Sequence, residues 1–420
     1  MSDHLDQTLA TAGYAKVLVT LADASAAADQ VEAALSDQFI AAPQAAELAM
    51  AASRFSETDS RPRKLKVYPR LGLAVGYVDN QGAAALRQSR RVQRVDAAPE
   101  LSLIRPVRIE ATPATAAAAA PITWGLQRLG APELWRLGFT GQGVRVAHLD
   151  TGVDGAHPAF PEGSIAAFAE VDLSGEIVPG DIQPWDSGDH GTHTAATILG
   201  RPTAERGRFG MAPDAQLVSA LVIEGGQVID RVLTGMEWAL GHEVRILSMS
   251  LGLRGWWPQF QTVIDSLRAH NVLPVIAVGN EGPNSSRSPG NYANVLSVGA
   301  MDNAERVADF SSSMRFNRAD DPLVPDLVAP GVDVLSAVPG GGYAMMDGSS
   351  MATPHVAGLA ALLASAEPQA SASDIEKAIL ESCVRPATMP QGRANRGVPD
   401  GVAALQLLGV PTTASAAPVS

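Results

Sequence analysis

The sequence has little of what disulfide-stapled or membrane-bound proteins depend on. Its 420 residues include one cysteine, Cys383, which excludes an internal disulfide framework, and no Cys/His cluster has the spacing of a zinc site. No stretch reaches the roughly 18 apolar residues of a membrane span. The beginning of the chain, MSDHLDQTLATAGYAKVLVT, also lacks the apolar run of a signal peptide. We therefore expect a protein that is cytoplasmic as synthesised and has no membrane partner, with signal-independent export left open.

The composition indicates a globular chain whose charge is unevenly distributed. Hydrophobic residues make up 46% and charged residues 18%, which suits a large buried core and two or three domains. Residues 54–108 carry 12 Lys and Arg against 5 Asp and Glu, whereas residues 121–420 have a net charge of −13. Such a pattern suits either nucleic-acid binding or docking of one part of the chain on the other. Because no basic stripe is rich in aromatic residues, we expect docking and no nucleic acid.

Residues 1–110 are predicted to form a small α+β domain. Strand patterns at 15–21, 65–69, 72–78 and 93–104 alternate with helical patterns at 26–39 and 80–92. Their order is β-α-β-β-α-β, a split-βαβ (ferredoxin-like) arrangement. A polar loop is expected at 50–63, and the low-complexity run ATPATAAAAAP at 111–121 predicts a linker.

Residues 122–409 are predicted to form an α/β domain with a doubly wound, mostly parallel sheet. Apolar strand runs at 144–149, 216–223, 245–250, 273–278 and 294–300 are interspersed with helical patterns at 228–240 and 259–270. Continuous Val, Ile and Leu strands between helices indicate a parallel sheet covered on both faces. In such folds the functional site forms beyond the carboxyl ends of the strands. A disordered tail is expected at 410–420.

The polar candidates fall at strand ends and helix starts. One strand run ends at Asp150 in DTG and another is followed by Asn280 in GNEG, although Asp and Asn also serve ordinary turns. DHGTHTAATILG places His190 and His193 at a helix start. Two such histidines suit a metal, but no third ligand is evident, so we favour one as a base and the other in the core. GSSMATPHVAG places Ser350 at another helix start, where serine is also a common N-cap.

Together these residues supply the parts of acyl transfer by a serine. A serine nucleophile passes its proton to an imidazole, and a carboxylate fixes the tautomer of that imidazole. A side-chain amide such as that of Asn280 can stabilise the oxyanion. The field at a helix N-terminus favours the negative charge that develops at Ser350.

From about residue 121 to residue 409 the chain resembles the subtilisin-like (subtilase) serine peptidases. The matching segments are VRVAHLDTGVDGAHP, DHGTHTAATILG, GMAPDAQLVSALVI, ILSMSLG, VIAVGNEGP, SPGNYANVLSVGA, LVAPG and GSSMATPHVAGLAALL. The chain order Asp, His, Ser is also that of subtilisin. The resemblance implies a serine endopeptidase in which Asp150 orients His190, His190 is the base and Ser350 attacks. Asn280 and the Ser350 N–H would form the oxyanion hole, and Ser349 stands where the family usually has Thr.

The same resemblance implies that protein substrates bind as an added β-strand. The residues that it assigns to substrate binding are Gly225, Gly226, Ser250, Leu251, Gly252, Gly279 and Arg287. Arg287 would lie at the base of the pocket for the residue that precedes the cut. We therefore expect acidic or polar side chains to be preferred there.

Residues 1–110 resemble the inhibitor-type propeptide of the family, mainly over GLAVGYVDNQGAAALRQSRRVQRVDAAPELSLI. This resemblance implies that the N-terminal domain is an intramolecular inhibitor of a zymogen. The linker at 111–121 then predicts self-cleavage between about Ile109 and Trp124.

Cofactors are not expected, and the sequence assigns no metal ligand. Ala159 stands in HPAF where many relatives have an Asp that helps to bind calcium, and the 200–210 loop lacks the usual Asn-rich ligands. We therefore expect the strongest calcium site of the family to be absent, while another calcium site stays open. The alternatives to an active endopeptidase are a silent or permanently inhibited scaffold and a processing protease dedicated to one partner.

Overall fold

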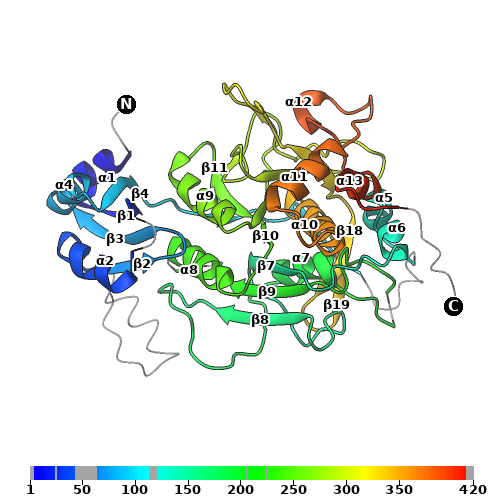
Figure 1. Ribbon diagram of the computed structural model, residues 1–420, viewed down its shortest axis with the longest axis horizontal. Coiled ribbons are helices and arrows are strands. Elements are labelled where there is room, and N and C mark those ends of the chain that lie inside the picture. Colours follow the sequence, from blue (N-terminus) through cyan, green and yellow to red (C-terminus); the bar gives the residue numbers. More distant parts are fainter. Residues whose placement is uncertain are drawn as a thin grey trace.

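The computed structural model describes residues 4–23, 26–42, 64–112, 121–204, 206–223, 225–226 and 228–412. The smaller N-terminal part lies at one end of the molecule, against α8 (Val228–Leu240) and α9 (Gln261–Ala269) of the larger part (Figure 1). No helix in these ranges is long and apolar enough to span a membrane. The predicted polar loop at 50–63 lies outside the described residues, as does most of the predicted tail.

The N-terminal part is an antiparallel sheet covered by helices. Its elements are α1 (His4–Ala12), β1 (Tyr14–Leu21), α2 (Ala28–Leu35), η1 (Ser36–Gln38), β2 (Leu65–Tyr68), β3 (Leu73–Asp79), α4 (Asn80–Gln88) and β4 (Val92–Ala97). The strand order is β2-β3-β1-β4, so β1 pairs with both β3 and β4. This arrangement matches the expected split-βαβ order, except that the strand predicted over 93–104 ends at Ala97 and Ser102–Leu103 form a separate strand that pairs with the larger part. Helix α1 was not predicted from the sequence, because only Leu5 and Leu9 of its nine residues are buried.

The larger part is built on a seven-stranded parallel sheet with the order β17-β14-β12-β10-β7-β9-β8. These strands are β7 (Arg145–Asp150), β8 (Ile165–Glu170), β9 (Gln216–Leu221), β10 (Ile246–Met249), β12 (Leu273–Ala277), β14 (Leu296–Met301) and β17 (Leu327–Pro330). The doubly wound α/β fold expected from the sequence is confirmed. All five predicted strand runs of this part are strands of the sheet.

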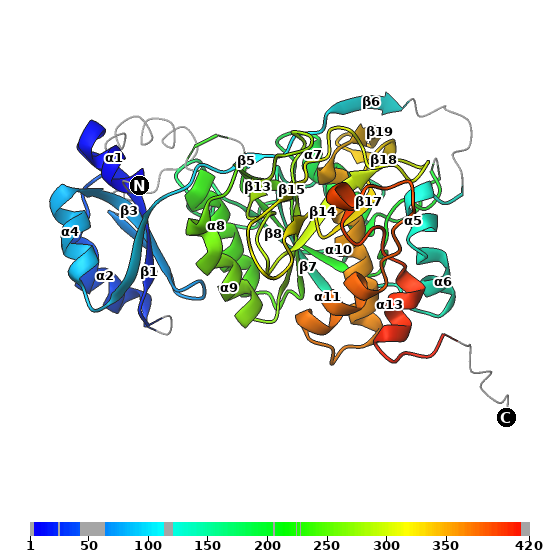
Figure 2. The same cartoon turned by 90° about the horizontal axis from the view of Figure 1, so that it is seen from above.

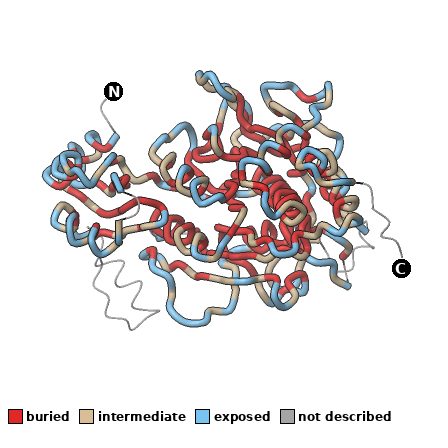
Figure 3. The backbone as a smooth tube through the Cα atoms, viewed as in Figure 1, coloured by how far each residue is buried: buried red, intermediate tan, exposed pale blue. Residues whose placement is uncertain are grey.

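Helices cover both faces of this sheet. On one face α7 (His190–Leu199) and α10 (Ser349–Ala366) pack in one apolar core with Val146 of β7. On the other face α8 (Val228–Leu240) and α9 (Gln261–Ala269) pack with Ala147 of the same strand. Successive residues of a strand point to opposite faces, which explains the two cores. The middle of the larger part, where α10 lies, is buried along most of its length (Figures 1 and 3).

Shorter elements surround this framework. They are α5 (Trp124–Arg128), α6 (Ala131–Arg136), η2 (Pro258–Phe260), β13 (Arg287–Ser288), β15 (Met314–Arg315), β16 (Leu323–Val324), β18 (Val334–Val338), α11 (Ala372–Glu381), α12 (Gln391–Ala394) and α13 (Gly401–Leu407). Helix α11 begins with a capping box between Ser371 and Asp374.

A segment between the two parts, residues 101–112, runs across the larger part and is called the strap below. In the strap, β5 (Ser102–Leu103) pairs with β11 (Leu251–Arg254), and β6 (Arg108–Thr112) pairs with β19 (Gly342–Asp347). Figure 2 shows this chain leaving the N-terminal part and passing along the larger one. The first two residues of the predicted linker, 111–112, are therefore strand. Residues 113–120 lie outside the described residues.

The N-terminal part docks through both apolar packing and ion pairs. Tyr68, Leu71 and Leu73 share one apolar core with α8 and α9. Around this core, ion pairs join Lys16 to Asp230, Lys66 to Glu176 and Arg70 to Glu237. Basic residues of one part thus meet acidic residues of the other, as the charge distribution predicts.

Candidate active site

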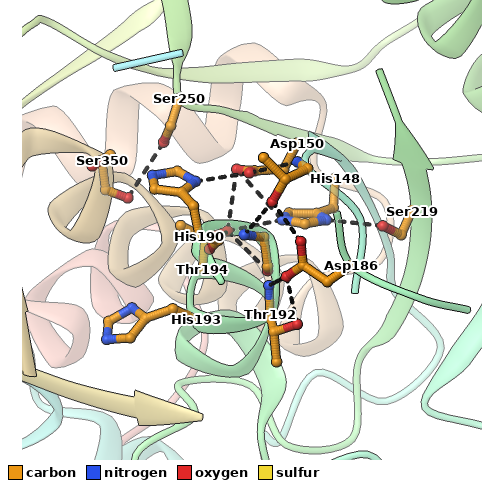
Figure 4. A network of polar contacts seen from close by, with 12 residues as sticks. His148, Asp150, Asp186, His190, Thr192, His193, Thr194, Ser219, Ser250 and Ser350 are labelled. Atoms are coloured by element: carbon orange, nitrogen blue, oxygen red, sulfur yellow. Dashed lines mark hydrogen bonds and ion pairs between the residues drawn. The ribbon is translucent and has the colours of Figure 1, made fainter. Parts of the chain in front are cut away.

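Asp150 and His190 meet at the carboxyl edge of the parallel sheet (Figure 4). Asp150 ends β7, and His190 is the first residue of α7. The Nδ1 atom of His190 lies 2.7 Å from Oδ1 of Asp150, which also accepts a 2.7 Å bond from the Thr151 N–H. Burial favours the neutral form of both groups, but the contact between them lowers the pKa of Asp150 and raises that of His190. The carboxylate therefore fixes the orientation of the imidazole and stabilises its protonated form.

Ser350 is the second residue of α10 and is fully buried. The N-cap of this helix is Gly348, so the interpretation of a serine N-cap is wrong. Pro354 is the sixth helical residue, not one of the first, and its missing N–H leaves the Ser350 carbonyl without its helical donor. The Ser250 hydroxyl lies 3.3 Å from that carbonyl and donates to it instead. Ser250 thereby supports the turn that carries Ser350.

The Ser350 hydroxyl makes no hydrogen bond to His190 in this structure. Its Oγ contacts the Sδ of Met351 at 3.4 Å, whereas Nε2 of His190 is buried and has no hydrogen-bond partner among the described residues. A buried nitrogen without a partner is costly. The arrangement thus leaves an imidazole acceptor beside Ser350 (Figure 4).

Asn280 follows β12 and is held by the start of α10. Its Oδ1 accepts bonds from the backbone N–H of Ser349 at 2.9 Å and from the Ser349 hydroxyl at 2.8 Å. These bonds fix the side-chain amide, so that its Nδ2 donates to the Arg105 carbonyl at 2.9 Å. Ser349, which stands where relatives usually have Thr, therefore orients Asn280.

The strap covers this site. The Ile104 N–H donates to the Ser250 carbonyl at 2.9 Å, and the Val107 N–H donates to the Asp347 carbonyl at 2.8 Å. Between these two anchors, the Arg105 carbonyl faces Asn280. Ile104 is 1% exposed, and His190 is 3% exposed. An extended segment of the chain itself thus contacts Asn280 directly and also contacts Ser250, which supports the Ser350 carbonyl.

Part of the predicted substrate surface pairs with the strap. Leu251 pairs with Leu103, and Gly252 pairs with Ser102. No described hydrogen bond joins the strap to Gly225 or Gly226. These glycines form a left-handed turn whose Gly225 carbonyl accepts a bond from Arg231. Gly279, with a φ of +118°, donates its N–H to the Ser349 hydroxyl at 3.3 Å and so belongs to the support of Asn280.

Arg287 is buried next to the strap, but its charge is already paired. Its Nε lies 2.9 Å from Oε1 of Glu281, and its Nη1 lies 3.0 Å from the Ser102 hydroxyl. Burial would raise the pKa of Glu281, but Arg287 lowers it, so both side chains are charged. Nε of Arg254, which is mostly exposed, also lies 3.3 Å from Oε1 of Glu281. Glu281 thus balances the buried charge of Arg287, and an acidic or polar preference in this pocket stays a prediction.

His193 faces away from the site into the core. Its Nε2 donates to the Val334 carbonyl at 3.0 Å, and burial lowers the pKa of its imidazole to about 3. Ala159 is buried, and its N–H donates to His157. Among the described residues no three His, Cys, Asp or Glu side chains converge as metal ligands would.

Sequence reasoning missed a layer of polar side chains behind Asp150. His148 lies two residues before Asp150 on β7, and Thr194 lies four residues after His190 on α7. Asp186 accepts bonds from the hydroxyls of Thr151 and Thr192. The period of two along a strand and of 3.6 along a helix places His148 and Thr194 beside the site, and this signal was available in the sequence.

The parallel sheet and the Asp, His, Ser and Asn side chains at its edge define the class of subtilisin-like serine peptidases. The chain belongs to the Subtilase family, whose family model matches residues 141–404. It is similar to subtilisin of Bacillus pumilus, with 35% identity over 257 residues that cover 60% of this chain and 87% of the relative. Subtilisin BL of Lederbergia lenta is 37% identical over 252 residues, with coverages of 60% and 87%. Subtilisin E of Bacillus subtilis is 35% identical over 257 residues, which span 63% of that relative. The chain is thus a subtilisin-like serine endopeptidase.

Proposed function

We propose that the chain hydrolyses peptide bonds of proteins through Ser350, His190 and Asp150. The observation that carries this proposal is the 2.7 Å hydrogen bond between Nδ1 of His190 and Asp150, together with the buried Nε2 of the same ring, which has no hydrogen-bond partner among the described residues. A rotation of the Ser350 side chain brings its hydroxyl to that nitrogen. His190 then takes the proton as Ser350 attacks the carbonyl carbon.

The remaining steps use the same groups. The tetrahedral oxygen accepts hydrogen bonds from Asn280 and from the Ser350 N–H, which lies in the first turn of α10 and has no helical acceptor. His190 passes its proton to the leaving nitrogen, and the carbon–nitrogen bond breaks. Water then attacks the acyl carbon and gives a proton to His190, which passes it to Ser350 Oγ as the ester bond breaks and the acid leaves. Asp150 stabilises the imidazolium in both half-reactions.

Hydrolysis of a peptide substrate tests this proposal. We expect Ser350→Ala and His190→Ala to lose turnover while they keep the melting temperature of the parent within a few degrees. His193→Ala serves as a control for the loss of a buried histidine, because it should lower stability more than it lowers turnover per folded molecule. Turnover by Ser350→Ala equal to that of the parent chain would refute the assignment.

We further propose that the N-terminal part is an intramolecular inhibitor. The specific observation that favours it is the strap, which occupies the edge strand position beside β11 and presents the Arg105 carbonyl to Asn280. Arg108 strengthens the hold through ion pairs with Asp347 and Asp333. A substrate strand and the strap cannot pair with β11 at the same time.

Pro106 affects whether the strap can be cleaved at the bond next to Asn280. The bond that follows the Arg105 carbonyl is Arg105–Pro106, and its nitrogen carries the ring Cδ in place of a hydrogen. His190 would have to protonate a ring nitrogen whose surroundings are filled by that carbon. We infer that this bond resists cleavage and that the strap inhibits as an intact chain.

The self-cleavage predicted between Ile109 and Trp124 then calls for a second molecule. To bring residue 109 to Asn280, the strap would have to slide by four residues, which breaks the pairing of both β5 and β6. We infer that a first cut in this window is intermolecular, so its rate per molecule rises with protein concentration.

A dilution series with mass analysis of the fragments tests both statements. The wild type should be cut within 109–124 at a rate per molecule that rises with concentration, and Ser350→Ala should stay intact. Pro106→Ala should be cut after Arg105 at a rate per molecule independent of concentration. Cleavage of the wild type after Arg105, or cleavage of Ser350→Ala at the same bond, would contradict the account.

A further inference from the structure

A second histidine lies behind Asp150 and has no part in the mechanism above (Figure 4). His148 is 1% exposed. Its Nδ1 lies 3.0 Å from the Ser219 hydroxyl, and its Nε2 lies 2.9 Å from the Thr194 hydroxyl. The Thr194 hydroxyl lies 3.3 Å from Oδ2 of Asp150. Polar side chains of β9, β7 and α7 therefore form a continuous chain that ends on the carboxylate.

The direction of these hydrogen bonds follows from the partners available. Ser219 is fully buried, and among the described residues its hydroxyl has no partner except Nδ1 of His148. Since buried hydroxyls donate where an acceptor exists, Ser219 donates to Nδ1. Burial lowers the pKa of His148, so its ring is neutral and carries its proton on Nε2. That Nε2–H donates to the Thr194 hydroxyl.

Thr194 then has one proton and three acceptors within reach. They are Oδ2 of Asp150 at 3.3 Å, the His190 carbonyl at 3.2 Å and the Gly191 carbonyl at 3.1 Å. A carboxylate is the strongest acceptor of the three because it is charged. Oδ1 of Asp150 already has two donors, whereas Oδ2 has no other hydrogen-bond donor among the described residues.

We propose that Ser219, His148 and Thr194 form a donor chain that ends on Oδ2 of Asp150 and sets how strongly Asp150 holds the proton of His190. They are positioning residues, because none of them touches the reacting atoms. The inference rests on the proposed roles of Asp150 and His190. It assigns to the buried His148 a part in adjusting the base of the reaction.

The sign of the effect follows from charge. A hydrogen bond from Thr194 satisfies part of the negative charge on Asp150. Without this bond the carboxylate attracts the His190 proton more strongly, and the pH at which His190 titrates rises. Besides Asp150 and His148, the charged or titratable groups that face His190 are Asp186, Asp189 and His193. A substitution of Thr194 changes none of them.

Substitutions on α7 provide a matched test. Thr194→Val removes the hydroxyl and keeps the shape, and Thr194→Ser restores the donor. Thr197→Val is the control, because its buried hydroxyl donates at 2.8 Å to the His193 carbonyl and touches no member of the donor chain. Nuclear magnetic resonance of the His190 ring is recorded against pH in the full-length chain, in a Ser350→Ala background that keeps the chain intact.

We expect Thr194→Val to raise the proton affinity of His190 about threefold, a fraction of one pKa unit. Thr194→Ser and Thr197→Val should leave it unchanged, and Ser219→Ala should shift it in the same direction by less. If Thr194→Val does not fold, Ser219→Ala decides the question. An unchanged His190 titration in Thr194→Val, or in Ser219→Ala where that variant decides, would overturn the inference. The titration needs no turnover, so it is independent of the hydrolysis assay that tests the proposed function.

Discussion

Replacement of Asn280 by alanine removes both the donor and the acceptor of one side chain. Its Nδ2 faces the carbonyl of the bound strap, and its Oδ1 accepts two bonds from Ser349. Loss of one oxyanion donor costs about 2.7–4 kcal/mol of transition-state stabilisation, which lowers kcat by roughly two to three orders of magnitude. Loss of the acceptor leaves the buried Ser349 N–H unpaired, which costs about 1–3 kcal/mol of folding stability.

Asn280→Asp separates these contributions, because it keeps an acceptor for Ser349 and removes the donor. We expect both variants to lose turnover to a similar degree and Asn280→Ala to lose more stability. The assay is kcat on a peptide amide, normalised to the amount of Ser350 that a fluorophosphonate labels, with thermal unfolding of each variant alongside. A kcat within threefold of the parent for Asn280→Ala would remove Asn280 from the mechanism.

The remaining predictions concern pH, salt and calcium. Burial alone would lower the pKa of His190, but Asp150 raises it above that of a free histidine. Because the base must be neutral, kcat/KM should fall as the pH drops through this raised pKa. A kcat/KM that does not change on the acidic side of the pH profile would contradict a neutral His190 base. Residues 1–110 supplied separately should inhibit residues 121–420 less strongly in high salt, because the ion pairs Lys66–Glu176 and Arg70–Glu237 are partly exposed and salt screens them. An inhibition constant that salt does not change would mean that apolar packing alone holds the two parts together. Because Ala159 lacks an oxygen ligand in its side chain, millimolar calcium should change the melting temperature little relative to a chelator, and a large rise would reveal a calcium site elsewhere.

The strands and helices of the larger part could be predicted because their apolar patterns reflect burial. The 228–240 helical pattern is α8, and the five strand runs all lie in the sheet. The candidates at strand ends could also be predicted to meet, since the carboxyl ends of parallel strands share one edge. Asp150 and His190 meet there as expected.

Features that depend on partners distant in the sequence could not be predicted in this way. The run 111–121 is typical of a linker, yet residues 111–112 are strand because they pair with β19, more than 200 residues later in the chain. Arg287 indicated a positive pocket, but Glu281 pairs with it. Ser250 donates to the Ser350 carbonyl because Pro354 has no N–H that could do so. This contact could not be predicted, because the position of Pro354 within the helix depends on the helix beginning directly after Gly348.

The most direct test of the account is the rate at which a fluorophosphonate labels Ser350 in the full-length chain, with the labelled residue located by mass spectrometry. We expect slow labelling of the wild type at Ser350 and no labelling of Ser350→Ala. Arg108→Gln, which removes the ion pairs of the strap with Asp347 and Asp333, should be labelled faster, whereas Arg136→Gln, which removes a surface pair with Glu133, should match the wild type. Labelling at another residue, or none in any of these proteins, would contradict a serine peptidase held by its own strap.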